Sequence, residues 1–181
     1  MKINPVCRTD INTLAFPDWI DRDDPRLQGE SLVLIHKSSR RIMHFSEGKS
    51  DSCWTIGLGF EAIGAKQIEG DGKTPEGWYH LTDKPESQFN HALSIHYPNS
   101  NDAKRGLNDK LISQAEYLDI TTGEATKERF EFTALGGLIL IHGGGSSIDW
   151  TLGCIALEDS DLLELRSTLP EDLHSIVLII P

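Results

Sequence analysis

The chain has 181 residues, of which 38% are hydrophobic and 25% are charged, a composition typical of one globular domain with a substantial core. Its 28 acidic and 17 basic residues give a formal net charge of −11, which disfavours nucleic acid and anionic membrane surfaces as partners. No run of about 18 apolar residues occurs, so insertion into a membrane is not expected.

The first thirty residues differ from the rest of the chain in composition. Residues 1–30 are polar and rich in aspartate and proline, which predicts an irregular arm or lead-in, with Trp19 and Ile20 as candidate anchors. No apolar segment of signal-peptide length occurs near the start, because proline and charged residues interrupt it. We expect the folded domain to span residues 31–181.

From Ser31 onward, short apolar runs alternate with turn residues, which is typical of β-strands. The first two runs flank the sequence KSSR and are expected to form a hairpin. The predicted strands are 31–36, 41–45, 52–59, 77–82, 92–97, 137–142 and 175–180.

Helical signals are few. Residues 158–169 carry acidic side chains at the start and leucines afterwards, a pattern that suits a helix N-terminus. Residues 101–119 are expected to hold one or two helical turns, broken near Gly106. The pattern predicts a mostly β single domain with a few short helices.

The segment 137–157, GLILIHGGGSSIDWTLGCIAL, has the composition of an acyl-transfer site. His142 follows an apolar run, and Cys154 lies twelve positions later. A cysteine is a strong nucleophile only as the thiolate, and a nearby imidazole is a common means of forming it. The glycines around both residues leave room for the backbone to close around a bound carbonyl group.

The three cysteines, Cys7, Cys53 and Cys154, show no CxxC or Cys/His ligand spacing. Neither a structural metal site nor a disulfide framework is therefore expected. A pair between Cys7 and Cys53 stays open, but buried or idle thiols are the favoured interpretation. No metal or organic cofactor is implied.

Three blocks of sequence resemble one family. IHG followed by DWTLGCIAL (149–157) is similar to the signature of L,D-transpeptidase (YkuD-type) catalytic domains, in the form DWTxGCIA. Residues 64–82 resemble the family segment GxKxxxGDGxTPEGxY, and residues 87–102 resemble its substrate-side loop. The resemblance implies a β-sandwich-like L,D-transpeptidase fold.

The resemblance also implies roles for individual residues. Cys154 would be the nucleophile and His142 the general base, although either could instead be a structural residue. Main-chain N–H groups of Gly153 and Cys154, with Leu152, would stabilise an oxyanion. Thr151 would hydrogen-bond the substrate or brace the loop.

Further residues are assigned to the substrate cleft. The expected substrate-binding residues are Gly143, Leu152, Trp150, Tyr97, Asn99 and Lys66, and Tyr79 and Asp102 are weaker candidates. His91 and His96 also lie near the third block, but solvent-exposed or core roles are favoured for both. Asp149 would either orient an active-site group or remain a solvated loop carboxylate.

Two positions depart from the commoner family pattern. Many members have histidine before the Gly-Cys pair and arginine or asparagine two residues after the cysteine. Here those positions hold Leu152 and Ala156. The change removes a cation that could hold a terminal carboxylate, so donor and acceptor specificity stay open.

The resemblance implies a cysteine acyltransferase that acts on peptidoglycan stem peptides. It would cleave the bond between diaminopimelate and D-alanine through a thioester, then pass the acyl group to an amine or to water. The alternatives are a thiol amidase or peptidase on another peptide, a non-catalytic wall-binding module, and an antibacterial effector with the same chemistry. The periplasm or cell envelope is the expected site of action, by an export route that stays open, as does cytoplasmic residence. The oligomeric state is not indicated.

Overall fold

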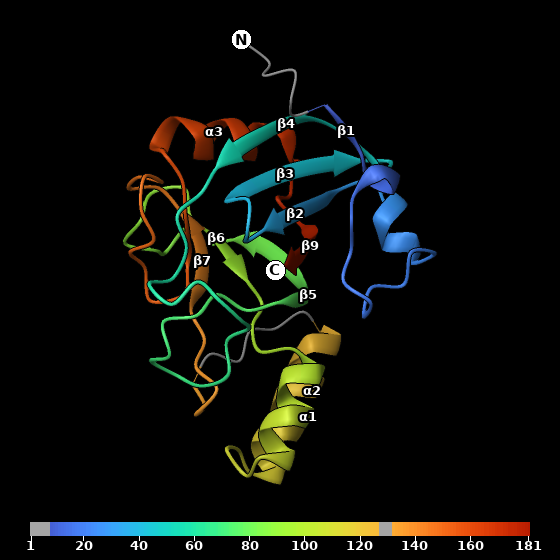
Figure 1. The fold of residues 1–181 in the computed structure, drawn as a ribbon. Helices are drawn as coiled ribbons and strands as arrows, with labels where there is room; N and C mark the ends of the chain where they lie inside the picture. The colour runs from blue at the N-terminus through green and yellow to red at the C-terminus, as the bar shows by residue number, and fades with distance from the viewer. Residues whose placement is uncertain (1–7, 127–131) are drawn as a thin grey trace.

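A single curled sheet of nine strands dominates the computed structural model, which describes residues 8–126 and 132–181 (Figure 1). The strand order is β1-β4-β3-β2-β9-β5-β6-β7-β8. The strands are β1 (Thr9–Asp10), β2 (Leu32–His36), β3 (Arg41–Ser46), β4 (Lys49–Thr55), β5 (Gly77–Asp83), β6 (Leu93–Ile95), β7 (Ile139–His142), β8 (Ile155–Ala156) and β9 (Ser175–Ile180).

The predicted strands all lie in this sheet, and the first two form the expected antiparallel hairpin, β2–β3. The predicted strand 52–59 is too long, because β4 ends at Thr55. Beyond it, Gly57 and Gly59 form isolated bridges with Ala156 and Thr151. The chain after β4 therefore reaches the far edge of the sheet, which curls the sheet and brings this segment beside the cysteine.

Two hydrophobic clusters occupy the two faces of the sheet. The larger lies inside the curl and combines side chains from strands β2 to β9 with Leu162 and Leu165. The smaller lies on the outer face of β2, β3 and β9, where Leu34, Phe45 and Leu178 are buried. Burial of apolar surface on both faces is the main source of stability for such a layered domain.

The described part of the N-terminal arm covers the outer cluster. It contains two short 3-10 helices, Ile11–Thr13 and Pro25–Gln28, and it buries Ile11, Ile20 and Leu27. Of the two predicted anchors, Ile20 is buried, whereas Trp19 is 49% exposed. The arm therefore packs on the sheet, and a domain boundary at residue 30 stays a prediction.

In the described residues, three α-helices accompany the sheet: α1 (Ser100–Asn108), α2 (Gln114–Thr126) and α3 (Asp159–Thr168). The helices α1 and α2 form a hairpin that projects from the sheet in Figure 1. The expected break comes shortly after Gly106, because α1 ends at Asn108 and α2 begins at Gln114. The missing Cβ of Gly106 lets Leu135 pack closely on α1. The helix α3 begins at the acidic cluster, as predicted.

The mostly β fold with a few short helices is confirmed. Cys53, in β4, is disulfide-bonded, so the idea that it is an idle thiol is wrong; Cys7 lies outside the described residues. Within residues 8–126 and 132–181, none of the helices combines the length and apolar character that crossing a bilayer requires.

Candidate active site

The pairing of β7 with β8 brings His142 and Cys154 to the same face of the sheet. The two strands run parallel, with Ile141 opposite Ile155. The same register sets Cys154 opposite Leu140, whose N–H donates to the cysteine sulfur at 3.4 Å. Because Ile141 and Ile155 point into the core, alternation directs Leu140, His142 and Cys154 to the other face. Cys154 immediately precedes β8, so this register sets its thiol diagonally across from the imidazole at the end of β7.

The Cys154 thiol is half-buried and bound to the backbone beside β7. Its S–H donates to the Leu138 carbonyl at 3.5 Å, and its sulfur accepts from Leu140. Burial raises the pKa of Cys154, although the Leu140 N–H and the charge of Lys66 act in the opposite direction. Among the described residues, the sulfur has no hydrogen bond to His142. The resting group is therefore a neutral thiol near pH 7.

His142 is only 2% exposed, and one hydrogen bond of its ring identifies the nitrogen that carries the proton. Its Nδ1 lies 2.6 Å from the carbonyl oxygen of Gly143, which can only accept, so Nδ1 carries the proton. Burial lowers the pKa of His142, and the Gly143 carbonyl offsets part of that effect. The neutral ring therefore keeps a free lone pair on Nε2, as a general base requires.

Two aromatic residues enclose this imidazole. Phe89 stacks on it with ring centroids 4.1 Å apart and an interplanar angle of 14°. Trp150 meets it edge-on at 5.6 Å and 76°. The Trp150 indole N–H donates to the Gly145 carbonyl at 3.1 Å. This bond fixes Gly145 in the glycine-rich loop that follows β7, residues 143–146. Phe89 was not singled out from sequence; its position inside the block 87–102 was the only available signal.

The acidic start of α3 binds the glycine-rich loop. The Gly144 N–H donates to Asp159 at 3.0 Å, and the Ser146 N–H donates to Glu158 at 2.9 Å. A Cβ at Gly143 would collide with the Asp159 carboxylate. The role of Gly143 is therefore to let the loop approach α3, and its expected contact with substrate stays a prediction.

Thr151 braces the cysteine turn. Its hydroxyl donates to the carbonyl of Cys154 at 2.7 Å and accepts from the N–H of Gly153 at 3.1 Å. The Gly153 N–H is therefore occupied in this arrangement, which leaves the Cys154 N–H as the better oxyanion donor. Gly153 has φ +129°, and a Cβ there would lie 2.6 Å from the Lys73 carbonyl, so only glycine fits.

Asp149 anchors the loop that precedes the cysteine. Both of its carboxylate oxygens bind the Arg40 guanidinium, and one also accepts from the Leu58 N–H at 2.9 Å. Burial raises the pKa of Asp149, but the hydrogen bonds from Arg40 and Leu58 outweigh it and hold that pKa below its usual value. Asp149 is thus an ionised structural anchor rather than a solvated carboxylate.

Lys66 does not reach the surface, and its expected contact with substrate stays a prediction. Its side chain is 3% exposed, and its Nζ donates to Asp71 and to the Ile68 carbonyl, each at 3.0 Å. The same carboxylate accepts from the N–H groups of Gln67, Ile68 and Lys73. The buried pair organises the turn 66–74. The positive charge of Lys66 offsets part of the effect by which burial raises the pKa of Cys154.

Two other residues expected to contact substrate are also buried, and their contact with substrate stays a prediction. Tyr97 is buried, and its hydroxyl donates to the Leu135 carbonyl at 3.1 Å. Asn99 is buried at the N-terminus of α1, where its side chain caps the helix and donates to the Trp78 carbonyl at 2.9 Å. Tyr79 and Asp102 bind each other at 3.1 Å in the same region. These residues support the fold.

The two departures from the commoner motif occupy different environments. Leu152 is 75% exposed beside the cysteine, where a substrate can reach it. Ala156 is fully buried in β8, and Gly57 pairs with it from the other side. The side chain at position 156 is therefore shielded from solvent, unlike that of Leu152.

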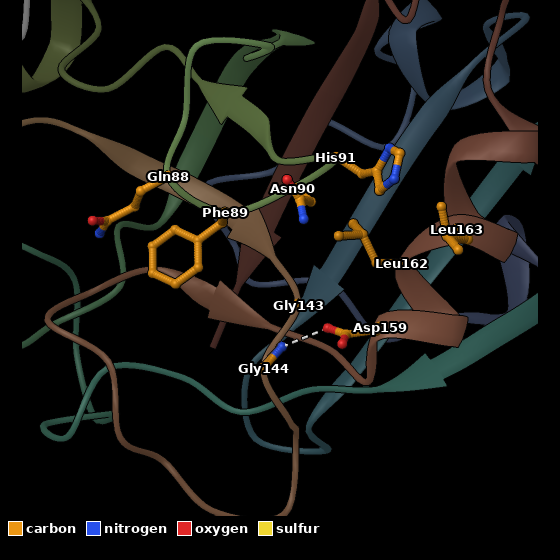
Figure 2. A pocket seen from close by; sticks show the side chains of 9 residues that line it. All are labelled: Gln88, Phe89, Asn90, His91, Gly143, Gly144, Asp159, Leu162 and Leu163. Atoms are coloured by element: carbon orange, nitrogen blue, oxygen red, sulfur yellow. Dashed lines mark hydrogen bonds between the residues drawn. The ribbon is translucent and has the colours of Figure 1, made fainter.

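A cavity of about 320 Å³ lies beside the histidine. The loop 88–91 forms one wall, α3 forms the other, and the glycines after β7 form the base (Figure 2). Its lining residues are Gln88, Phe89, Asn90, His91, Gly143, Gly144, Asp159, Leu162 and Leu163. In the described part of the chain, no cluster of three or more His, Cys, Asp or Glu side chains is arranged to hold a metal ion.

Comparison with known proteins gives the family. The model of the YkuD family, the L,D-transpeptidase catalytic domain, matches residues 30–178. No curated protein sequence shows a significant match.

Solved structures agree with this match. The helical cell shape determining protein Pgp2 from Campylobacter jejuni is similar, with 29% identity over 82% of this chain and a TM-score of 0.56. The K307A mutant of Pgp2 has 29% identity over 84% of this chain and a TM-score of 0.57. Bd1075 from Bdellovibrio bacteriovorus has 18% identity over 87% of this chain and a TM-score of 0.52, a likeness of fold alone.

This chain covers 46%, 47% and 50% of the three solved chains, respectively, so it spans about half of their length. The family match covers most of this chain, and the curled sheet agrees with it. The chain belongs to the YkuD family of L,D-transpeptidase catalytic domains.

Proposed function

We propose that this domain is a cysteine acyltransferase that acts on peptidoglycan stem peptides. The observation that carries the proposal is the placement of one free thiol, Cys154, diagonal to a neutral imidazole, His142, on one sheet face. Family membership supports the substrate class. The proposed donor bond joins the L-centre of diaminopimelate to D-alanine.

The first half of the reaction forms a thioester. The Cys154 thiol leaves the Leu138 carbonyl, gives its proton to Nε2 of His142, and its sulfur attacks the scissile carbonyl carbon. The N–H of Cys154 stabilises the resulting oxyanion, an interaction that contributes about 3 kcal/mol in comparable sites. The C–N bond then breaks, and the proton on His142 passes to the amine of the departing D-alanine.

The second half resolves the thioester. An amine attacks the acyl carbon, gives its proton to His142, and releases the sulfur, which recovers that proton as a thiol. The product is a crosslink or an exchanged D-amino acid. With water as the nucleophile, the product is a shortened stem, which is L,D-carboxypeptidase activity.

Two observations support a site of action in the cell envelope. Cys53 is disulfide-bonded, and disulfides persist mainly in oxidising compartments outside the cytoplasm. The similar Pgp2 is a helical cell shape determining protein, which fits a role in modifying wall peptides.

One observation favours a second candidate, a non-catalytic wall-binding module. The resting thiol binds the backbone beside β7 instead of His142, and burial raises its pKa. A module of this kind would bind stem peptides without releasing D-alanine, so product analysis separates the two functions.

The proposal is tested by incubating the full chain with purified muropeptides that carry tetrapeptide stems and identifying the products by mass spectrometry. We expect release of D-alanine by the wild-type chain and none by the Cys154→Ala variant. Addition of a second D-amino acid should divert part of the product to the exchanged stem. Release by Cys154→Ala at the wild-type rate would reject the assigned nucleophile.

A further inference from the structure

The loop between β5 and β6, residues 84–92, is held against α3 near the candidate base. The loop is closed by the Lys84 N–H, which donates to the Ala92 carbonyl at 3.0 Å. Arg166, from α3, donates to Asp83 at 2.8 Å and to the His91 carbonyl at 3.0 Å. These bonds hold the base of the loop, which carries Phe89, in a defined position.

Phe89 does not belong to any of the hydrophobic core clusters of the described residues. It is half-buried, its two neighbours Gln88 and Asn90 are exposed, and it lines the cavity drawn in Figure 2. Its ring nevertheless lies parallel to the imidazole of His142 at a centroid distance of 4.1 Å. The ring is therefore placed for a contact with the base rather than for core packing.

The hydrogen bond from Nδ1 to Gly143 fixes one edge of the imidazole but leaves the ring plane free to tilt. Phe89 covers a face of that ring, and Trp150 contacts it edge-on. A stacked aromatic pair contributes about 0.5–1.5 kcal/mol beyond the burial of its surface, enough to select one ring orientation. The same contact keeps water from a face of the ring.

We propose that Phe89 is a positioning residue for catalysis, which holds the imidazole of His142 in the orientation that leaves Nε2 free for the Cys154 proton. This inference rests on the proposed function for its catalytic consequence only. The stacking and its effect on the imidazole exist whether or not the thiol forms an acyl-enzyme.

Burial, rather than the titratable groups around His142, is the main influence on the pKa of its imidazole. Asp159 and Glu158 of α3 bind main-chain N–H groups of the loop, His91 lies in the loop of Phe89, and Cys154 precedes β8. Burial lowers the pKa of His142. Removal of the Phe89 ring would hydrate the imidazole and move its pKa upward.

The test compares Phe89→Ala and the conservative Phe89→Tyr with a matched control, Leu163→Ala, on the opposite wall of the cavity. The imidazole of His142 is titrated by NMR in the full chain, and kcat and KM are measured with tetrapeptide muropeptides. Melting curves establish folding; if Phe89→Ala does not fold, Phe89→Leu replaces it.

For Phe89→Ala we expect the titration midpoint to move to higher pH and kcat to fall at least about tenfold, with KM changed less than threefold. Phe89→Tyr and Leu163→Ala should retain the wild-type midpoint. An unchanged midpoint in Phe89→Ala, an effect on KM alone, or an equal shift in Leu163→Ala would overturn the inference. The titration does not depend on turnover, so failure of the proposed function would appear separately, as activity in Cys154→Ala or as no release of D-alanine by the wild-type chain.

Discussion

Arg40 and Asp149 form an ion pair between two distant parts of the chain, with an N–O distance of 2.6 Å. Arg40 lies in the turn of the first hairpin, and Asp149 begins the DWT segment before the cysteine. The Asp149 carboxylate also accepts from Leu58. The β2–β3 hairpin thus anchors the segment that precedes Cys154.

The first prediction concerns this ion pair. Arg40→Ala leaves Asp149 half-buried with only part of its hydrogen bonding, so we expect a loss of about 1–2 kcal/mol in the free energy of unfolding. Turnover should fall further than stability alone explains, since the loop loses its anchor. The adjacent cation gives the control: Arg41→Ala should change neither quantity by as much. Urea unfolding and initial rates measure both; equal effects of the two variants would contradict the anchor role.

The second prediction concerns acid. Asp71 and Asp149 both have pKa values below the usual range, since hydrogen bonds to each carboxylate outweigh its burial. A depressed pKa in the folded state contributes stability above the unfolded value of about 3.9, and this stability is lost as pH falls through the folded pKa. We expect the free energy of unfolding to fall steeply below about pH 4, and less steeply in Asp149→Asn. Urea titrations from pH 3 to 7 with parallel curves would argue against this.

The third prediction concerns the brace of the cysteine turn. Thr151→Val removes the hydroxyl that binds Gly153 and Cys154, and leaves a buried N–H without a partner, at a cost of about 1–3 kcal/mol. We expect kcat/KM to fall about tenfold or more through displacement of the sulfur. Thr151→Ser keeps the hydroxyl and should restore most of the rate. If Val and Ser variants are equally active, the brace has no catalytic importance.

The fourth prediction concerns the buried ion pair of Lys66 and Asp71. Lys66→Met leaves Asp71 buried without its cation, so we expect a loss of about 3 kcal/mol in the free energy of unfolding. It should also raise the pKa of the Cys154 thiol, seen as slower alkylation of that residue at a fixed pH near 8. Lys73→Met, on the same turn, is the control and should affect both quantities less. Faster alkylation in Lys66→Met would show that the charge does not reach the sulfur.

The sequence was informative where short-range patterns determine structure. The short apolar runs between turn residues predicted the strands, and the acidic cluster at Glu158 predicted the start of α3. The segment 137–157 gave the candidate histidine and cysteine. Such signals are local, because an apolar run between turn residues and the cap of a helix depend on neighbours in the chain.

Other features depend on contacts between distant segments, which no local pattern reveals. The curl of the sheet arises from Gly57 and Gly59 meeting the cysteine segment. Lys66 and Tyr97 were expected in the cleft and are buried, since motif position does not distinguish a buried support from a surface contact. Phe89 was overlooked for the same reason, since only the folded loop brings it to His142.

The most direct test of the central claim is the intact mass of the full chain, quenched with acid during turnover of a tetrapeptide stem. The account predicts a covalent adduct equal to the stem minus its terminal D-alanine, located on Cys154 by peptide mapping and missing from Cys154→Ala. Release of D-alanine with no adduct on Cys154, together with activity in Cys154→Ala, would contradict it.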